Sequence, residues 1–237
     1  KPVFIDLNIN TGLPSLNELN KKISSETSIL FITHLYSNKK ELKNISKFKK
    51  RNKIKIIEDM AINFGLKNKN KFTNLDADYS FFSFNYMKNF STINGGMVHT
   101  KNKNDFNKLI SISKDLKKSS NFNLLFNILR VYFLNIFFNK IIFNFFSFYI
   151  FSLIEKKNIN FLKKFLYPGF FRKKMIILKN RKINDIATNF FPTTIKELKQ
   201  DIINRKFKAI RYFVNLKKNK SIKCIHPTYT DSVHLEY

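Results

Sequence analysis

The feature that most constrains the fold is the regular alternation of short apolar runs with helical patterns over the first 118 residues. The apolar runs contain many β-branched and aromatic side chains, which is typical of strands. They lie at residues 3–6, 28–33, 53–59, 79–84 and 96–100. Helical patterns lie at residues 16–22, 39–51 and 104–116. Strands and helices that alternate with short connections predict an α/β fold with a mostly parallel sheet flanked by helices.

Polar side chains lie at the carboxyl ends of three of these predicted strands. His34 follows one strand, Glu58 and Asp59 end the next, and residues 83–88 lie at the end of a third. In parallel sheets, functional residues gather at the carboxyl ends of the strands. The sequence therefore predicts that these strand ends form a functional site.

The character of the chain changes at about residue 119. Lys140 is the only charged residue between residues 131 and 154, and the intervals between polar residues predict two short amphipathic helices with a break near Asn139. Residues 156–182 then contain ten basic side chains and no acidic one. A hydrophobic helical segment beside a cationic one suits an anionic membrane surface. A helical insertion that packs on its own protein, with a solvated basic face, is an equal alternative.

The overall charge and the single cysteine exclude several classes of function. The formal net charge is +28, but the basic residues are spread over both halves of a chain rich in Lys, Asn, Ile and Phe, and no nucleic-acid-binding motif accompanies them. We therefore expect no specific nucleic-acid partner. One cysteine, Cys224, cannot form an internal disulfide, which favours a reducing cytoplasm. The four histidines lack ligand spacing, so no metal site is expected.

Four short motifs, in this order along the chain, resemble those of one enzyme family. They are VFIDLN at residues 3–8, HLYS at residues 34–37, IIEDMAINFG at residues 56–65 and SFNYMKNFSTINGGM at residues 83–97. Their order and spacing are similar to those of the DegT/DnrJ/StrS sugar aminotransferases, which use pyridoxal 5'-phosphate (PLP) and have the fold-type I architecture of aspartate aminotransferase. The resemblance covers about residues 1–118, and the helical pattern at residues 195–216 resembles a later helix of the family that contacts the dimer partner.

The resemblance implies a role for each of four residues. Lys88 matches the Schiff-base lysine, which also acts as a base. Asp59 matches the carboxylate beside the pyridine nitrogen, and Ser83 matches the hydroxyl that bonds to the cofactor phosphate. Asn180, in a partial match over residues 179–189, would reach the phosphate held by the neighbouring subunit of a homodimer. Glu58 is interpreted as structural support.

The resemblance also implies an organisation in three parts. Residues 1–118 would form a partial PLP-binding large domain and residues 119–175 a hydrophobic and basic helical insertion. Residues 176–237 would begin a small α+β domain. The sequence starts without Met on a strand-like run, which suggests a fragment of a longer chain, truncated at both ends.

The function implied is the PLP-dependent transamination of a nucleotide-linked keto-sugar in surface polysaccharide biosynthesis. Glutamate would be the amino donor. The enzyme would be cytoplasmic, with the inner face of the membrane as a further location if residues 119–182 contact anionic lipid. The alternative is a catalytically inactive fragment or paralogue of that family, with association with the membrane surface as a further role. It is favoured by Ile62, which lies where the family usually has Gln.

Overall fold

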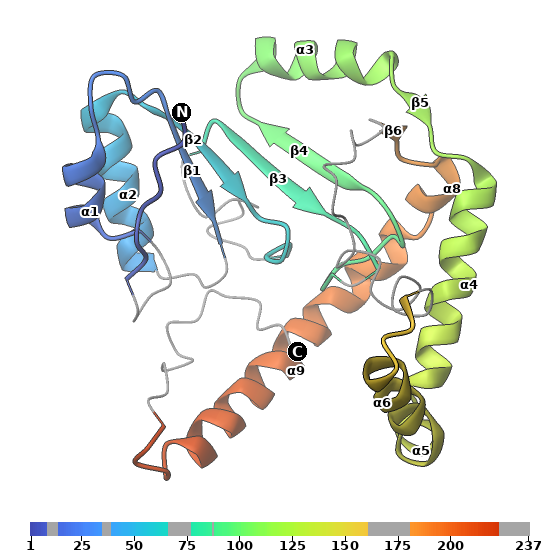
Figure 1. Cartoon of the computed structure of the whole chain (residues 1–237). Coiled ribbons are helices and arrows are strands. Elements are labelled where there is room, and N and C mark those ends of the chain that lie inside the picture. Colours follow the sequence, from blue (N-terminus) through green and yellow to red (C-terminus); the bar gives the residue numbers. More distant parts are fainter. Residues whose placement is uncertain (9–13, 35–38, 66–76, 87, 161–180, 223–237) are drawn as a thin grey trace. The chain divides into compact units, whose positions relative to one another are not determined.

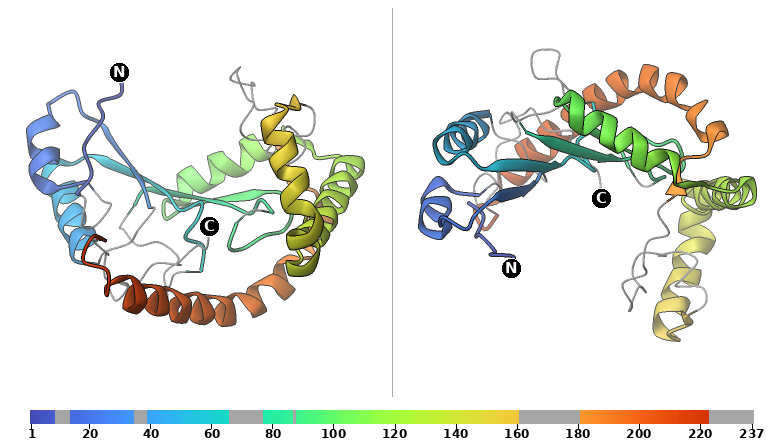
Figure 2. Two further views of the ribbon diagram at one scale, coloured as in Figure 1. Left: turned by 60° about the horizontal axis from the view of Figure 1, so that its bottom comes forward. Right: turned by 90° about the horizontal axis from the view of Figure 1, so that it is seen from above.

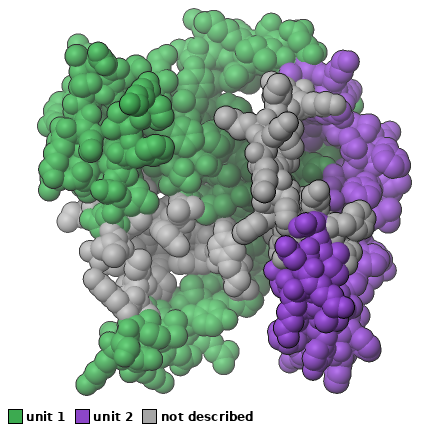
Figure 3. Space-filling model, viewed as in Figure 1, with its two compact units in different colours: residues 1–115, 185–237 green, residues 116–184 purple. Residues whose placement is uncertain are grey.

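A computed structural model describes residues 1–8, 14–34, 39–65, 77–86, 88–160 and 181–222. It divides into two compact units, which Figure 3 colours separately. Unit 1 consists of residues 1–115 and 185–237, and unit 2 of residues 116–184. The three-part division made from the sequence stays a prediction.

Unit 1 is built on a four-stranded sheet (Figure 1). Its strands are β1 (Ile29–Thr33), β2 (Lys55–Asp59), β3 (Tyr79–Ser83) and β4 (Gly96–Thr100), in that order across the sheet. The pairs β1–β2 and β2–β3 are parallel and β3–β4 is antiparallel. The prediction of a mostly parallel sheet is therefore confirmed.

Four of the helices described in unit 1 lie where the periodicity predicts them, and the short α8 was not predicted. The helices are α1 (Leu16–Lys22), α2 (Lys39–Asn52), α3 (Lys103–Lys114), α8 (Asp185–Thr188) and α9 (Phe191–Leu216). Local capping explains where two of them begin. The Ser15 hydroxyl accepts from the Glu18 N–H at the start of α1, and Asn102 accepts from the N–H groups of Asn104 and Asp105 at the start of α3.

One face of the sheet is buried by two hydrophobic clusters. The first joins Leu30, Ile32 and Ile56 of the sheet to residues of α1 and α2, which lie side by side in Figure 2. The second joins Phe82 to Phe64, Phe84 and Phe90 and to Leu198 of α9. The opposite face is more open: Ile29, Phe31 and Val98 are each about half exposed.

The predicted strand at residues 3–6 is wrong. Leu7 and Pro14 form an isolated antiparallel bridge, and the residues before it form no regular element. The apolar side chains there stay at the surface, because Val3 and Phe4 are exposed. An apolar run becomes a strand only when another strand pairs with it, and none does so here among the described residues.

The described part of unit 2 consists mainly of helix. It contains α4 (Asn121–Phe137), α5 (Lys140–Ile142), the π-helical segment η1 (Phe143–Ser147) and α6 (Phe148–Lys156). A parallel two-residue ladder joins β5 (Lys117–Lys118) to β6 (Arg181–Lys182). The helical break near Asn139 is confirmed. Within the described chain, no single helix has the length and hydropathy to cross a bilayer, although α4 and residues 140–156 meet these criteria as a bent pair.

Candidate active site

The carboxyl ends of the three parallel strands lie beside one another. Asp59, the last residue of β2, is in register with Thr33 of β1 and with Phe81 of β3. Ser83 ends β3 and is opposite Gly96 of β4. Register partners point to the same side of a sheet and successive residues alternate, so Thr33, Asp59 and Ser83 share one face. This is the more open face, and both Asp59 and Ser83 are half-buried.

The backbone around Asp59 is held by hydrogen bonds on both sides. The Asp59 carbonyl accepts from the His34 N–H at 3.0 Å, and the next residue, Met60, donates to the Phe81 carbonyl at 2.9 Å. The carboxylate itself accepts from the Ala61 N–H at 2.9 Å. The position of the carboxylate is therefore fixed relative to all three parallel strands.

A buried polar network lies on the opposite side of the same strand ends. Glu58 and His34 are both 0% exposed, and His34 Nε2 lies 3.0 Å from Glu58 Oε1. The Ser80 hydroxyl donates to Glu58 Oε2 at 2.8 Å. The Asn63 side-chain amide donates to the His34 carbonyl. One carboxylate thus joins β1, β2 and β3 one residue before Asp59.

Lys88 lies on the loop between β3 and β4. It closes a turn by donating its backbone N–H to the Asn85 carbonyl at 2.9 Å, and its side chain is half-buried. The next two residues anchor the loop. Asn89 donates its side-chain amide to the Phe64 carbonyl at 2.7 Å, and the Phe90 ring lies 4.5 Å from the Phe64 ring, centre to centre. Because Phe64 follows Asp59 by five residues, the loops that carry Asp59 and Lys88 are tied together.

The glycine pair that follows this loop has a steric cause. Gly95 has a φ of 123°, a conformation that side chains rarely allow. A Cβ on Gly96 would lie 2.6 Å from the Phe82 carbonyl oxygen of the neighbouring strand. The close pairing of β4 with β3 beside Ser83 therefore requires glycine at position 96.

The four candidate residues fall into two groups. Asp59, Ser83 and Lys88 lie at adjacent strand ends of unit 1 or on the loop that follows, whereas Asn180 lies outside the described residues. Their functional roles stay predictions. The sequence analysis missed Ser80 and Asn89. Strand alternation puts Ser80 on the same face as Phe82 of its own strand, but only the register of β2 with β3 places it opposite Glu58.

The three residue types suit a particular kind of ligand. A lysine amine can bond covalently to a carbonyl carbon, a carboxylate can stabilise a protonated ring nitrogen, and a serine hydroxyl can donate to a phosphate oxygen. A carboxylate, a hydroxyl and an amine at one edge of a sheet therefore fit an aromatic aldehyde that carries a phosphate.

The first half of the chain matches a known family model. Residues 1–122 match the model of the DegT/DnrJ/EryC1/StrS aminotransferase family. The chain is 32% identical over 109 residues to GDP-perosamine synthase of Escherichia coli O157:H7, covering 46% of this chain and 30% of that protein. It is 29% identical over 113 residues to 3-oxo-glucose-6-phosphate:glutamate aminotransferase of Bacillus subtilis, covering 47% of this chain and 25% of that protein.

The similarity in fold extends over nearly the whole chain. The crystal structure of NtdA from Bacillus subtilis, with its cofactor PMP bound, superposes with a TM-score of 0.57 at 19% identity. The superposition covers 98% of this chain and 42% of that one. The chain thus spans less than half the length of each of these three proteins.

Proposed function

The chain belongs to the DegT/DnrJ/EryC1/StrS aminotransferase family, and on that premise we propose that the protein carrying it is a PLP-dependent sugar aminotransferase. The observation that carries the proposal is the arrangement of Asp59, Ser83 and Lys88. Two of them end neighbouring strands on one face of the sheet, and the third lies on a loop tied to the segment after Asp59 by the Asn89–Phe64 hydrogen bond. These residues fit the chemical groups of PLP.

Each residue then has a distinct task. PLP, when bound, supplies the electron sink for the electrons released at the substrate carbon. The Lys88 amine would hold the cofactor through its aldehyde carbon and move a proton to and from the substrate carbon. The Asp59 carboxylate would keep a proton on the ring nitrogen. The Ser83 hydroxyl would donate to the phosphate, and Asn180 would do so across a dimer.

The names of the relatives support the substrate class. GDP-perosamine synthase points to a nucleotide-linked keto-sugar, and the Bacillus subtilis enzyme, by its name, uses glutamate. We therefore propose a nucleotide-linked keto-sugar as acceptor and glutamate as donor, in surface polysaccharide biosynthesis. The single cysteine supports a cytoplasmic location.

An exposed apolar stripe on α9 supports a homodimer. Ile203, Phe207, Ile210 and Val214 are all exposed, and their spacing of four, three and four residues places them on one side of the helix. This stripe begins beyond Leu198, which packs into the second hydrophobic cluster. Pairing of two α9 helices would bury it.

Reductive trapping tests the proposal directly. The full-length protein is incubated with PLP, reduced with borohydride and digested, and the labelled peptide is identified by mass spectrometry. We expect the label on Lys88. Lys88→Ala should abolish the label and lower turnover at least about 100-fold, as loss of a catalytic base does. Asp59→Asn should keep the label and lower turnover, and Lys101→Ala, at the residue after β4, serves as the matched control.

The inactive alternative makes the opposite prediction. Ile62, half-buried three residues after Asp59, is the residue that favours it. If the full-length protein carries no label at Lys88, or carries it on another lysine, the proposed active site is refuted. If Lys88 is labelled but no amino transfer occurs, an inactive paralogue that retains its cofactor is the better description.

A further inference from the structure

The exposed face of α4 is apolar along its whole length. Seven exposed side chains form what we call the α4 stripe: Phe122, Leu125, Phe126, Leu129, Tyr132, Phe133 and Ile136. Intervals of one, three and four residues place them on one side of the helix. Phe122 is 76% and Tyr132 65% exposed. A helix of a soluble domain shows the opposite pattern, with its apolar stripe facing inward.

The second arm of unit 2 exposes a similar surface. The chain bends by 65° between residues 121–137 and 140–156. Aromatic contacts hold the bend, since the Phe138 ring lies 5.7 Å from Phe151 and 6.0 Å from Phe143. Beyond it, the exposed apolar side chains are Ile141, Phe145, Phe146, Phe148, Tyr149, Ile150 and Leu153. Both arms of the bent pair thus carry apolar surface.

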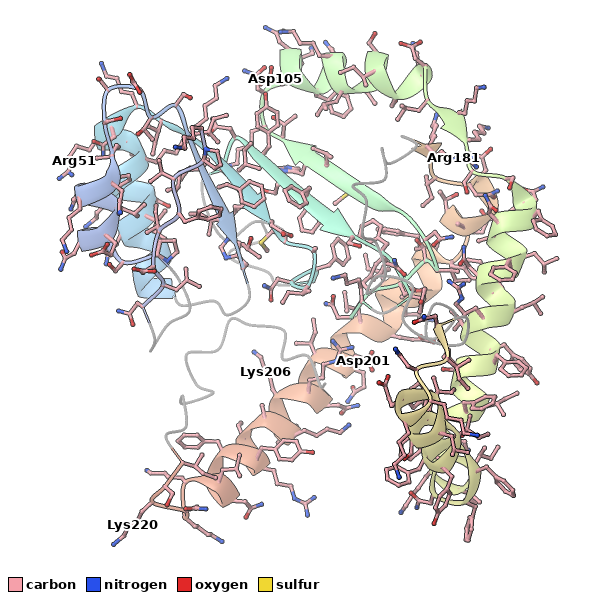
Figure 4. The ribbon with its side chains drawn as sticks, viewed as in Figure 1. Arg51, Asp105, Arg181, Asp201, Lys206 and Lys220 are labelled. Carbon is pink, nitrogen blue, oxygen red and sulfur yellow. The ribbon has the colours of Figure 1, made fainter. Side chains whose placement is uncertain are left out.

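Unit 2 is also strongly cationic. Residues 116–184 contain 14 basic side chains and one acidic side chain, Glu155. The β5–β6 ladder brings four exposed cations together, with Lys117 opposite Arg181 and Lys118 opposite Lys182 (Figure 4 labels Arg181). Like charges directly opposite each other on neighbouring strands repel. Four cations held this close together favour the binding of an anionic group.

Hydrogen bonds fix this cationic ladder to the start of α4. The Ser119 N–H donates to the Lys182 carbonyl at 3.0 Å. The Asn184 side-chain amide donates to the Ser119 carbonyl at 2.9 Å and to Asn121 Oδ1 at 2.8 Å. The α4 stripe begins at the next residue, Phe122. The cations and the first apolar anchor are therefore held close together by the fold.

We propose that unit 2 binds an anionic membrane surface, with the α4 stripe inserted at the boundary between head groups and acyl chains and the β5–β6 ladder on lipid phosphates. Helices that lie in this boundary combine an exposed apolar face with basic side chains. A second copy of unit 2 suits the surface poorly, because each copy has 13 more positive than negative side chains. An anionic bilayer offers negative head groups to the basic side chains and an apolar interior to the α4 stripe.

The bend favours an orientation in which α4 and residues 140–156 lie in the membrane plane rather than cross the membrane. None of the described helices meets the criteria for a membrane span by itself. Lys140 is exposed at the bend, where its long side chain can reach the head groups. The two arms would therefore rest in the interface.

Tryptophan fluorescence provides the first test, because the chain contains no tryptophan. Tyr132→Trp places a single reporter on the α4 stripe, and Phe106→Trp places one at an exposed position of α3 as the control. The full-length variants are mixed with phosphatidylcholine vesicles that contain phosphatidylglycerol and bromine-labelled acyl chains, and the unsubstituted full-length protein gives the baseline for any tryptophan outside residues 1–237. We expect a blue shift and quenching for Tyr132→Trp and neither change for Phe106→Trp.

Charge removal provides the second test. Replacing Lys117, Lys118, Arg181 and Lys182 with Gln should weaken binding to these vesicles at least about 10-fold, because each basic side chain near an anionic surface contributes about fivefold. Replacing four exposed lysines of unit 1 with Gln, at positions 50, 103, 108 and 114, removes the same charge and should change binding little. Added salt should weaken wild-type binding.

Three outcomes would overturn the proposal. The first is binding to pure phosphatidylcholine vesicles that is as strong as binding to the anionic vesicles. The second is equal quenching in the Tyr132→Trp and Phe106→Trp variants. The third is an equal loss of binding from the two sets of Gln substitutions. Failure to float with anionic vesicles at low salt would overturn it too. None of these measurements depends on transamination, so the result is independent of the proposed function.

Discussion

Glu58 is the residue on which the three strand ends depend. Its two carboxylate oxygens contact His34 of the segment after β1 and Ser80 of β3, and the group is fully buried. A buried carboxylate is stable only when its oxygens are paired. The sequence predicted that Glu58 supports the structure. It could not predict the partners, because strand register decides which side chains meet.

Ser80→Ala should therefore destabilise the protein more than an ordinary surface substitution. The change removes one hydrogen bond to a buried charged group, which costs about 1.5–3 kcal/mol in the free energy of unfolding. Glu58→Ala should cost more than Ser80→Ala, since it removes the contacts with both Ser80 and His34. Urea unfolding measures both. Ser113→Ala, whose hydroxyl bonds to a carbonyl of its own helix α3, is the matched control. Equal losses for Ser80→Ala and Ser113→Ala would contradict the network.

At the scale of elements, Asp78 links α2 to the sheet. Its Oδ2 lies 2.9 Å from Lys49 Nζ of α2 and accepts from the Ile56 N–H of β2 at 2.7 Å. Burial acts to raise the pKa of Asp78, but these two hydrogen bonds, together with the positive charges of Lys49 and Lys55, outweigh it and hold the pKa below its usual value. The ionised carboxylate therefore stabilises the junction of α2, β2 and the start of β3.

This arrangement predicts an acid-dependent loss of stability. Because the folded-state pKa of Asp78 is lowered, its ionised carboxylate contributes fully to stability above the unfolded-state pKa of about 3.9. This contribution is lost as the pH falls through the lower folded-state pKa. The Asp78→Asn variant should be less stable than wild type at pH 7, and its stability should depend less on pH between about 5 and 3. The difference in the free energy of unfolding between wild type and variant should stay below about 1 kcal/mol, since the Asp78 side chain is about a third exposed. Urea midpoints across this range test it, with exposed Asp115→Asn as the control. Parallel pH curves for wild type and Asp78→Asn would refute the role.

Elements with a strong local pattern could be predicted, and those that depend on distant partners could not. Strands β1 to β4 follow from the short apolar runs that alternate with helical patterns. The helical break at Asn139 follows from the spacing of the polar residues. Residues 3–6 carry a strand pattern, but no strand in the described part of the chain pairs with them. The Phe191 ring of α9 lies 4.8 Å from that of Phe90, a contact across a hundred residues that no local pattern indicates.

At the scale of the whole molecule, the motifs identified the family because they span the segment that the family model matches. The polar residues lie at adjacent strand ends but on two faces of the sheet, with Asp59 and Ser83 on the open face and Glu58 on the buried one. The homodimer, in contrast, was predicted only from the resemblance to the family. The structure adds an exposed apolar surface on α9, and substitutions on this surface make the proposed dimer testable.

Replacing Phe207 and Ile210 with Ser should weaken the dimer. Both side chains are exposed on the α9 stripe and neither belongs to the hydrophobic clusters of unit 1, so the fold should survive. Burying a large apolar side chain contributes about 1.5–3 kcal/mol, and a twofold interface loses each contact twice. The dimer dissociation constant should therefore rise at least about 100-fold in light scattering or sedimentation of the full-length protein. Phe106→Ser with Ile110→Ser, two exposed apolar residues of α3, is the matched control. An unchanged dimer in the α9 variant, or equal dissociation in the α3 variant, would show that the subunits associate through another surface.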